Sequence, residues 1–298
     1  MHVIFLFIDG VGLGPAGKNN PFTPNSYSAF KRMSGGQSFT NDAKPIKKDN
    51  HFFAPVDANL GVEGLPQSGT GQTALFSGEN AAKLIGKHFG PWPHSGVAHL
   101  LEEESVFNKA RALGKTVHFI NAYPEIFFQK AKKRGRWTGT TLLARGAQTR
   151  LNGPEQVKKG RAVTAGIIQK AWKEQLKIDV PIISPQTGGR RLLKESQKYD
   201  LLLHEYYLTD KAGHSQNQEA AKRNLNIYND FLETIIAEKP AETTIVLSSD
   251  HGNIENLSTK THTRNKVPLF VCGPGAKAFF KATSILDVTP KIIKVLAD

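Results

Sequence analysis

The chain has 298 residues, of which 39% are hydrophobic and 22% charged. At about 150 residues per domain, this length allows one large domain or two ordinary ones, and the composition excludes a disordered chain. Cys272 is the single cysteine, which excludes a disulfide framework, and 39 basic against 26 acidic residues give a net charge of +13. Such a surface favours anionic partners such as phosphate esters, nucleotides, nucleic acid or acidic lipid.

The first predicted element is an apolar run over residues 3–8, which is too short for a signal peptide core or a membrane span. We therefore expect a soluble, cytoplasmic protein that does not enter a membrane. Further strands are predicted over 116–121, 201–207, 243–248 and 267–272, and helices over 96–113, 216–238 and 287–296. This alternation predicts an α/β fold with a mostly parallel central sheet flanked by helices, whose ligands bind at the carboxyl ends of the strands.

Residues 124–195 interrupt this alternation. We interpret them as a small inserted cap or lid on a core made of residues 1–123 and 196–298. The segment carries lysine and arginine runs over 130–136, 158–161 and 188–191. Such runs are usually solvated surfaces, but in a cap they could also close over an anionic substrate.

Residue types that bind metals recur beside the predicted strands. They are Asp9, Asp210, His214, Asp250, His251 and His262. A single aspartate after a strand is commonly a helix cap, and a single histidine is commonly an ordinary surface or core residue. Their recurrence at one predicted sheet edge instead indicates a site for two metals, and mixed carboxylate and imidazole donors suit zinc or manganese.

A glycine-rich loop over residues 64–78 leads into a predicted helix and carries the hydroxyls of Ser68, Thr70, Thr73 and Ser77. Backbone N–H groups at a helix N-terminus favour a phosphate group, although such a loop can also be a simple turn with a helix cap. The loop lacks the Gly-Lys-Ser/Thr ending of a Walker motif, and the chain has no Gly-x-Ser-x-Gly elbow.

Together these motifs resemble the alkaline phosphatase superfamily, and in particular the branch that holds cofactor-independent phosphoglycerate mutase and phosphopentomutase. The resemblance covers residues 1–80 and 195–298. Its motifs are FIDGVG (7–12), GQT (71–73), DKAGH (210–214), SSDHGNIE (248–255) and THTRNKVP (261–268).

The resemblance implies two divalent cations, Mn²⁺ or Zn²⁺ with Mg²⁺ as an alternative. Asp9, Asp250, His251 and the nucleophile would bind one cation, whereas Asp210, His214 and His262 would bind the other. The nucleophile position falls on Thr73, where the mutase branch has Gly-x-Ser, and Thr70 is the second choice. Either hydroxyl could lose its proton when bound to a metal.

Three further residues are candidates for binding a substrate. Arg264 follows a predicted ligand by two residues, Lys211 follows Asp210 directly, and His88 lies in an aromatic and proline-rich loop. Each has a plain alternative: a surface position for Arg264 and Lys211, and a packing role for His88.

The sequence therefore predicts a two-metal phosphoryl-transfer enzyme for a small phosphorylated substrate, most simply a phosphatase or phosphodiesterase with a phosphothreonine intermediate. One alternative is a phosphosugar or phosphoglycerate mutase. Another, from a different class, is a basic nucleic-acid-binding protein without turnover. The segment 124–195 is shorter than the mutase insertion and lacks its arginine-rich signature, so the resemblance does not supply the substrate, and the oligomeric state stays open.

Overall fold

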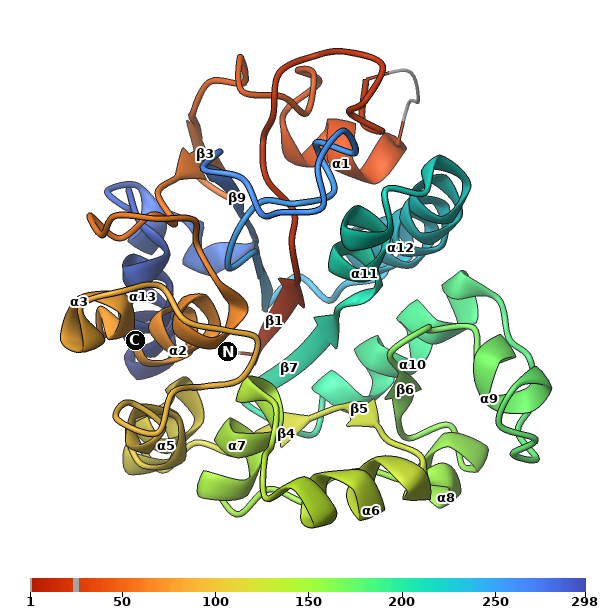
Figure 1. The fold of residues 1–298 in the computed structure, drawn as a ribbon. Helices are drawn as coiled ribbons and strands as arrows, with labels where there is room; N and C mark the ends of the chain where they lie inside the picture. The colour runs from red at the N-terminus through yellow and green to blue at the C-terminus, as the bar shows by residue number, and fades with distance from the viewer. Residues whose placement is uncertain (1, 24–26) are drawn as a thin grey trace.

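The computed structural model of the protein describes residues 2–23 and 27–298. In these residues a seven-stranded sheet has the order β2-β3-β9-β8-β1-β7-β4, and helices cover both of its faces (Figure 1). Its strands are β1 (His2–Ile8), β2 (Ile46–Lys48), β3 (His51–Val56), β4 (Val117–Phe119), β7 (Leu201–Tyr206), β8 (Thr243–Ser248) and β9 (Val267–Cys272). A separate pair consists of β5 (Asn121–Ala122) and β6 (Val163–Thr164). The predicted α/β fold with a central sheet flanked by helices is confirmed.

The helices connect these strands in chain order. They are α1 (Ser28–Met33), α2 (Ser68–Ser77), α3 (Ala81–Ile85), α4 (His99–Glu102), α5 (Val106–Ala112), α6 (Glu125–Arg134), α7 (Gly139–Gly146), α8 (Pro154–Lys158), α9 (Lys170–Glu174), α10 (Pro185–Ser196), α11 (Leu208–Ser215), α12 (Gln218–Glu238) and α13 (Val288–Ala297), with 3₁₀ turns over Pro274–Phe279 and Ile285–Asp287. The helix expected over 96–113 is divided into α4 and α5. The division arises because Ser105 caps α5, its side chain accepting a hydrogen bond from the backbone N–H of Asn108.

β1 lies in the middle of the sheet and is buried on both faces. Its side chains alternate, so that Val3, Phe5 and Phe7 join one hydrophobic core and Ile4, Leu6 and Ile8 join the other. The first core includes side chains of α2, α5, α7 and α13, and the second includes side chains of α10 and α12. This explains why the run has no polar member, as expected for a strand with no solvent-facing side.

The sheet is mixed rather than mostly parallel. β1 runs parallel to β7 and β8, and β4 runs parallel to β7, but β9 is antiparallel to both β8 and β3. The extension made by β3 and β2 was not predicted, since Pro55 within β3 argues against a strand. Because β9 is antiparallel, it begins at the edge where β8 ends, and residues preceding β9 therefore reach the same edge as residues following β8.

The segment 124–195 has two kinds of packing. Leu143 of α7 and Leu192 of α10 belong to the two main cores, whereas Val157, Trp172 and Val180 form part of a small separate cluster. Val163 and Ile167, from the middle of the segment, also belong to the second main core. The segment thus shares the main cores along much of its length, and the small cluster is the part that packs by itself. The borders at residues 124 and 195 stay a prediction.

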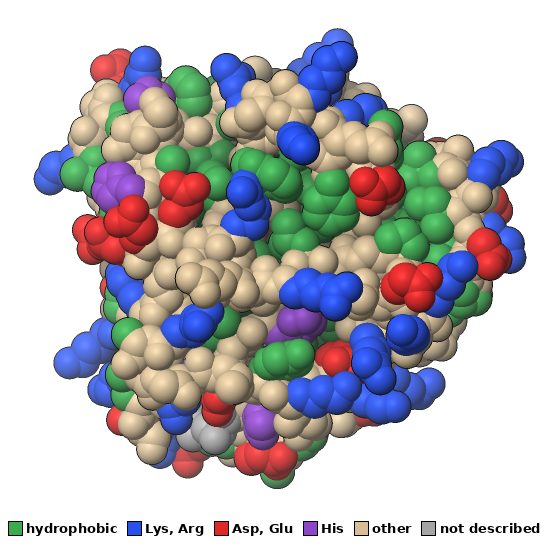
Figure 2. All heavy atoms as spheres, turned by 90° about the horizontal axis from the view of Figure 1, so that it is seen from below, with side chains coloured by type: hydrophobic (Ala, Val, Ile, Leu, Met, Phe, Trp, Pro, Cys, Tyr) green, Lys and Arg blue, Asp and Glu red, His purple; other side chains and the backbone are tan. Residues whose placement is uncertain are grey.

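Figure 2 shows the molecule from the lower side of Figure 1, where α6 and α8 lie. Lysine and arginine side chains are spread over this face, and hydrophobic side chains gather between them. Among the described residues, no helix combines the length and apolar character needed to cross a bilayer.

Phe76 tests the packing of α2 on the sheet, because its ring meets the rings of Phe5 and Phe7 edge to face at centroid distances of 5.8 and 5.1 Å. Phe76→Ala should lower the free energy of unfolding by about 3–5 kcal/mol in urea titrations, as expected for a buried cavity. Leu84→Ala is the control: its side chain is 63% exposed, so a change below about 0.5 kcal/mol is expected. Equal effects of the two substitutions would contradict this packing.

Candidate metal centre

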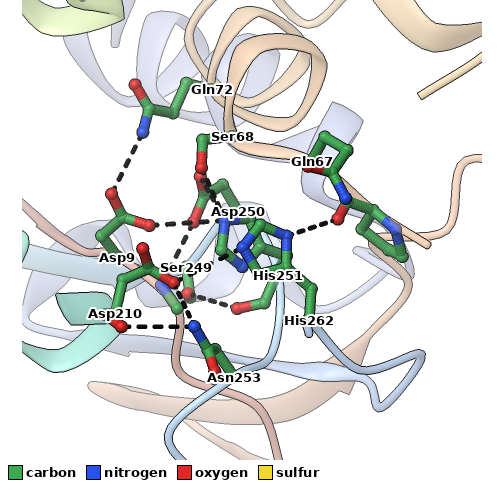
Figure 3. A network of polar contacts seen from close by, with 12 residues as sticks. Asp9, Gln67, Ser68, Gln72, Asp210, Ser249, Asp250, His251, Asn253 and His262 are labelled. Carbon is green, nitrogen blue, oxygen red and sulfur yellow. Dashed lines mark hydrogen bonds and ion pairs between the residues drawn. The ribbon is translucent and has the colours of Figure 1, made fainter. Parts of the chain in front are cut away.

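The six side chains predicted as metal ligands lie together beyond the carboxyl ends of β1, β7 and β8. The six residues are Asp9, Asp210, His214, Asp250, His251 and His262, and Figure 3 shows all of them except His214. β1 lies between β7 and β8 and is parallel to both, so the residues that follow the three strands meet at one edge. His262 reaches this edge through the antiparallel β9. The structure brings these residues together, while their role as ligands stays a proposal.

One group is formed by Asp9, Asp250 and His251, which are all buried and offer ligand atoms within 4.8 Å of one another. His251 Nε2 lies 3.4 Å from Asp9 Oδ1 and 3.4 Å from Asp250 Oδ2. Neither of these two oxygens has a hydrogen-bond partner among the described residues. Buried carboxylate oxygens are normally paired, so two unpaired ones aimed at the same place point to a cation.

The second group is formed by Asp210, His251 and His262, with His214 beside it. His214 Nε2 lies 3.2 Å from Asp210 Oδ2 and 3.1 Å from His262 Nε2. His251 belongs to both groups and stacks on His262 at a centroid distance of 3.7 Å. The two groups therefore form one continuous centre.

Hydrogen bonds fix which nitrogen of two histidines faces the centre. His262 Nδ1 lies 2.6 Å from the carbonyl oxygen of Pro66, and His214 Nδ1 lies 2.7 Å from that of Lys260. A carbonyl only accepts, so both Nδ1 atoms carry the proton. When the rings are neutral, their Nε2 lone pairs face each other across 3.1 Å, which requires a proton or a cation between them. This second contact of each ring is the usual support of a metal-binding histidine.

The electrostatics of the centre agree with this arrangement. Burial and the neighbouring Asp250 raise the pKa of Asp9 well above its ordinary value, and burial raises the pKa of Asp250 to about 7. Burial also acts on Asp210, but the hydrogen bond with His214 and the charges of nearby histidines hold its pKa well below the ordinary value. Burial lowers the pKa of His262 to about 4, which keeps that ring neutral. Crowded, buried carboxylates of this kind are stabilised by positive charge.

Glu255 organises the loops that carry these residues. Its buried carboxylate accepts hydrogen bonds from the backbone N–H groups of Gly12, at 2.9 Å, and Asn253, at 2.8 Å. The side chains of Thr263 and Asn265 donate to its other oxygen. One carboxylate thus joins the loop after β1 to the loops on either side of His262.

The N-terminus of α2 adds a hydroxyl to the centre. The helix begins at Ser68, whose Oγ lies 3.0 Å from His251 Nε2. One turn later, Gln72 donates from Nε2 to Asp9 Oδ2 at 3.2 Å. A Cβ on Gly71 would lie 2.9 Å from the carbonyl oxygen of Asp250, so the glycine permits the close approach that places Ser68 in the site.

Thr73, the nucleophile position that the resemblance implies, does not lie at the N-terminus of α2. Thr73 lies in the middle of α2, is fully buried, and donates from Oγ1 to the carbonyl oxygen of Gly69 at 2.7 Å. The hydroxyl of Thr70 is the acceptor for the backbone N–H of Phe89 at 3.2 Å. The hydroxyl that faces the centre is that of Ser68. In the sequence, Ser68 is the first hydroxyl residue after Pro66, and this position could have indicated that the helix begins there.

Glu205 was not predicted as a site residue. It lies on β7, and its buried Oε2 accepts hydrogen bonds from Thr140 Oγ1 at 2.9 Å and from Tyr123 Oη at 3.2 Å. Burial raises its pKa to about 7. It lines the same cavity as Asp9 and Ser68. An acidic residue within the apolar run 201–207 was the available signal.

The predicted substrate residues lie in different places. Lys211 lines the cavity beside the centre. Arg264 instead donates from Nε to the carbonyl oxygen of Gly64 at 3.0 Å, and His88 Nε2 lies 3.3 Å from that of Val62. Neither Arg264 nor His88 is among the residues that line this cavity.

Comparison with known sequences gives partial matches. Residues 183–297 match the model of the metalloenzyme superfamily. The chain is 30% identical over 109 residues to the 2,3-bisphosphoglycerate-independent phosphoglycerate mutase of Anaplasma marginale, and 34% identical over 110 residues to that of Ehrlichia ruminantium. Each match covers 34% of this chain and 22% of the relative, so the chain matches about a fifth of these proteins' length.

The fold likeness extends over the whole chain. The alkaline phosphatase from the Antarctic bacterium TAB5 has a TM-score of 0.58 at 15% identity, covering 99% of this chain and 98% of that one. The phosphoglycerate mutase of Leishmania mexicana has a TM-score of 0.52 at 10% identity, covering 99% and 95%. At such identities the likeness concerns the fold alone. The chain therefore has an alkaline phosphatase-like fold, and its residues 183–297 are similar to the metalloenzyme superfamily.

Proposed function

We propose that the protein is a metal-dependent phosphoric ester hydrolase that works through a phosphoserine at Ser68. The observation that carries the proposal is the position of Ser68 Oγ, 3.0 Å from the histidine shared by both ligand groups. Ser68 also begins α2, so that backbone N–H groups and the positive end of the helix dipole face the reacting phosphoryl group. Phosphothreonine at Thr73 is not retained, because its hydroxyl is used inside the helix.

The residues of the centre fit two divalent cations. Asp9, Asp250 and His251 would hold one beside Ser68, and Asp210, His214 and His262 would hold the other. Nitrogen and carboxylate donors suit Zn²⁺ or Mn²⁺. When bound, the cations would make the serine hydroxyl more acidic and neutralise charge on the phosphoryl and leaving oxygens.

The protein's own groups account for the order of events. Ser68 Oγ, having lost its proton to solvent, attacks phosphorus, and the Oγ–P bond forms as the bond from phosphorus to the leaving oxygen breaks. The leaving oxygen takes a proton from water and departs as an alcohol. A water oxygen then attacks the phosphoserine, the Oγ–P bond breaks, and Ser68 regains a proton as inorganic phosphate leaves. Gln72 holds Asp9 in place throughout through its hydrogen bond.

A mutase is the second candidate, supported by the identity of 30–34% that residues of this chain share with phosphoglycerate mutases. The chemistry is the same until the phosphoserine is formed, and the two functions differ in whether water or a second hydroxyl of the substrate takes the phosphoryl group. Release of inorganic phosphate supports a hydrolase, and an isomeric phosphate ester supports a mutase. A nucleic-acid-binding role does not account for the buried carboxylates of the centre.

Ser68→Ala should lower turnover of a generic aryl phosphate by more than about a hundredfold, because the nucleophile is lost. Thr73→Ala should retain activity within roughly a few fold, since it loses one internal hydrogen bond of α2. Mass spectrometry of acid-quenched wild type should locate the phosphoryl group on Ser68. Loss of activity in Thr73→Ala, with Ser68→Ala active and both variants folded, would contradict the assignment.

Asp250→Asn should stabilise the metal-free protein at alkaline pH. The pKa of Asp250 is raised from 3.8 to about 7 in the folded state, so its contribution favours folding at low pH and is lost as pH rises towards 7. Relative to wild type, the variant should therefore gain roughly 2 kcal/mol more at pH 8 than at pH 5, measured by urea unfolding after chelation.

The same pair of proteins tests metal binding. Zn²⁺ or Mn²⁺ should raise the melting temperature of wild type at pH 8 and raise that of Asp250→Asn much less, because an anionic ligand is missing. Asp179→Asn is the control, since the Asp179 side chain is 94% exposed. An equal metal-induced shift in all three proteins would place the cations elsewhere.

A further inference from the structure

A cavity of about 530 Å³ adjoins the metal centre. Its inner wall includes Asp9, Ser68 and Gln72, and its outer wall is built from side chains of other elements. A volume of this size suits a small organic ligand. The space next to Ser68 therefore accommodates the organic part of a phosphate ester, and the outer wall indicates its chemistry.

The outer wall is aromatic. Its aromatic members are Trp92, Tyr123, Phe127, Trp172 and Tyr207. The rings of Tyr123 and Phe127 stack at a centroid distance of 4.1 Å, and Tyr123 is tied to Glu205 by a hydrogen bond of 3.2 Å. Trp172 is only 7% exposed. The wall is thus held by its own contacts and is already formed before a ligand enters.

Trp92 is fixed to the same helix that carries Ser68. The backbone N–H of Thr70 donates to the carbonyl oxygen of Phe89 at 2.9 Å, and that of Phe89 donates back to Thr70 Oγ1 at 3.2 Å. A Cβ on Gly69 would clash with the carbonyl oxygen of Trp92. The loop that carries Trp92 therefore lies directly on the first turn of α2, at a set position relative to the nucleophile.

The charges of the cavity restrict the ligand further. Among its lining residues, all within the described part of the chain, Lys211 is the single lysine or arginine. Recognition of a second carboxylate or phosphate group usually employs arginine in a two-pronged contact. No lysine or arginine of the segment 124–195 lines the cavity. Two of them are paired elsewhere: Arg190 with Glu238 at 2.7 Å, and Lys158 with Asp179 at 3.3 Å. The expectation that this segment presents basic residues to the substrate is therefore not met, because Phe127 and Trp172 take that place.

We infer that the substrate is a phosphate ester whose organic part is a flat aromatic group without a second anionic group. This inference rests on the proposed function and specifies its substrate class. The ring enters the space among Trp92, Phe127 and Trp172, while the phosphoryl group meets Ser68. Apolar area removed from water provides the affinity, and the aromatic faces favour a planar group. An aryl alcohol and a nucleoside share this chemistry and are separated by the experiment.

Binding can be followed through tryptophan fluorescence, without turnover. The chain has three tryptophans, of which Trp92 and Trp172 line the cavity, whereas Trp137 does not and instead carries the guanidinium of Arg145 over its ring at 4.1 Å. With Zn²⁺-loaded protein, benzylphosphonate should change the emission and bind about tenfold more tightly than ethylphosphonate. The preference should persist in Trp137→Phe and fall in Trp92→Leu and Trp172→Leu. Equal affinity for the two phosphonates would overturn the inference.

Turnover separates this inference from the proposed function. Benzyl and ethyl phosphate have leaving alcohols of similar acidity, so a lower KM for the benzyl ester reports binding of the ring. Trp92→Leu should raise the KM for benzyl phosphate by a larger factor than the KM for ethyl phosphate. A preference for adenosine 5′-monophosphate over benzyl phosphate assigns the ring to a nucleoside, and a preference for 3-phosphoglycerate overturns the inference. If no ester is hydrolysed while benzylphosphonate still binds preferentially, the proposed function fails and the aromatic pocket stands.

Discussion

The structure depends on one electrostatic constraint, which is the collection of three carboxylates at a single, largely buried edge of the sheet. Asp9, Asp210 and Asp250 cannot all be charged there without opposing charge, and burial already raises the pKa of two of them. The surrounding contacts hold the carboxylates together rather than apart. Glu255 joins their loops, and Gly71 lets α2 approach Asp250 closely. Burying three carboxylates without opposing charge would cost free energy, whereas bound cations would compensate their charge.

The parts of this centre that local sequence describes were predictable. The apolar run of β1 and the polar residues that follow β1, β7 and β8 are recognisable in the sequence. A strand buried on both faces is apolar throughout, and the change to polar residues marks where it ends. The sequence predicted that His262 lies at this edge of the sheet, but it did not predict why. His262 precedes β9, and because β9 is antiparallel to β8, β9 begins at the edge where β8 ends. Pro55 concealed β3, so the antiparallel half of the sheet could not be anticipated.

Other parts depend on contacts between distant segments. Ser68, and not Thr73, lies on the side of α2 that faces His251, and that side is set by the approach of Gly71 to the loop after β8. Glu205 acquires its surroundings from Thr140 and Tyr123, which lie more than sixty residues away in the chain. The lysine and arginine runs of the segment 124–195 were conspicuous because they are contiguous. The aromatic residues that this segment contributes to the cavity, Phe127 and Trp172, were not conspicuous in the sequence, because they lie far apart in the chain and on separate helices.

The central place of β1 has a consequence for how the chain acquires its structure during synthesis. β1 precedes its two neighbours in the chain by a long interval, since β7 and β8 begin at residues 201 and 243. A growing chain must therefore reach residue 201 before this apolar strand finds its first neighbour. Pairing over such sequence separation is slow, and unpaired apolar strands associate readily with other chains. The hydrogen bond between Gly12 and Glu255 spans 243 residues, so the candidate metal centre is completed only after residue 255 has been made. Until β7 is available, the nascent chain carries an unpaired apolar segment.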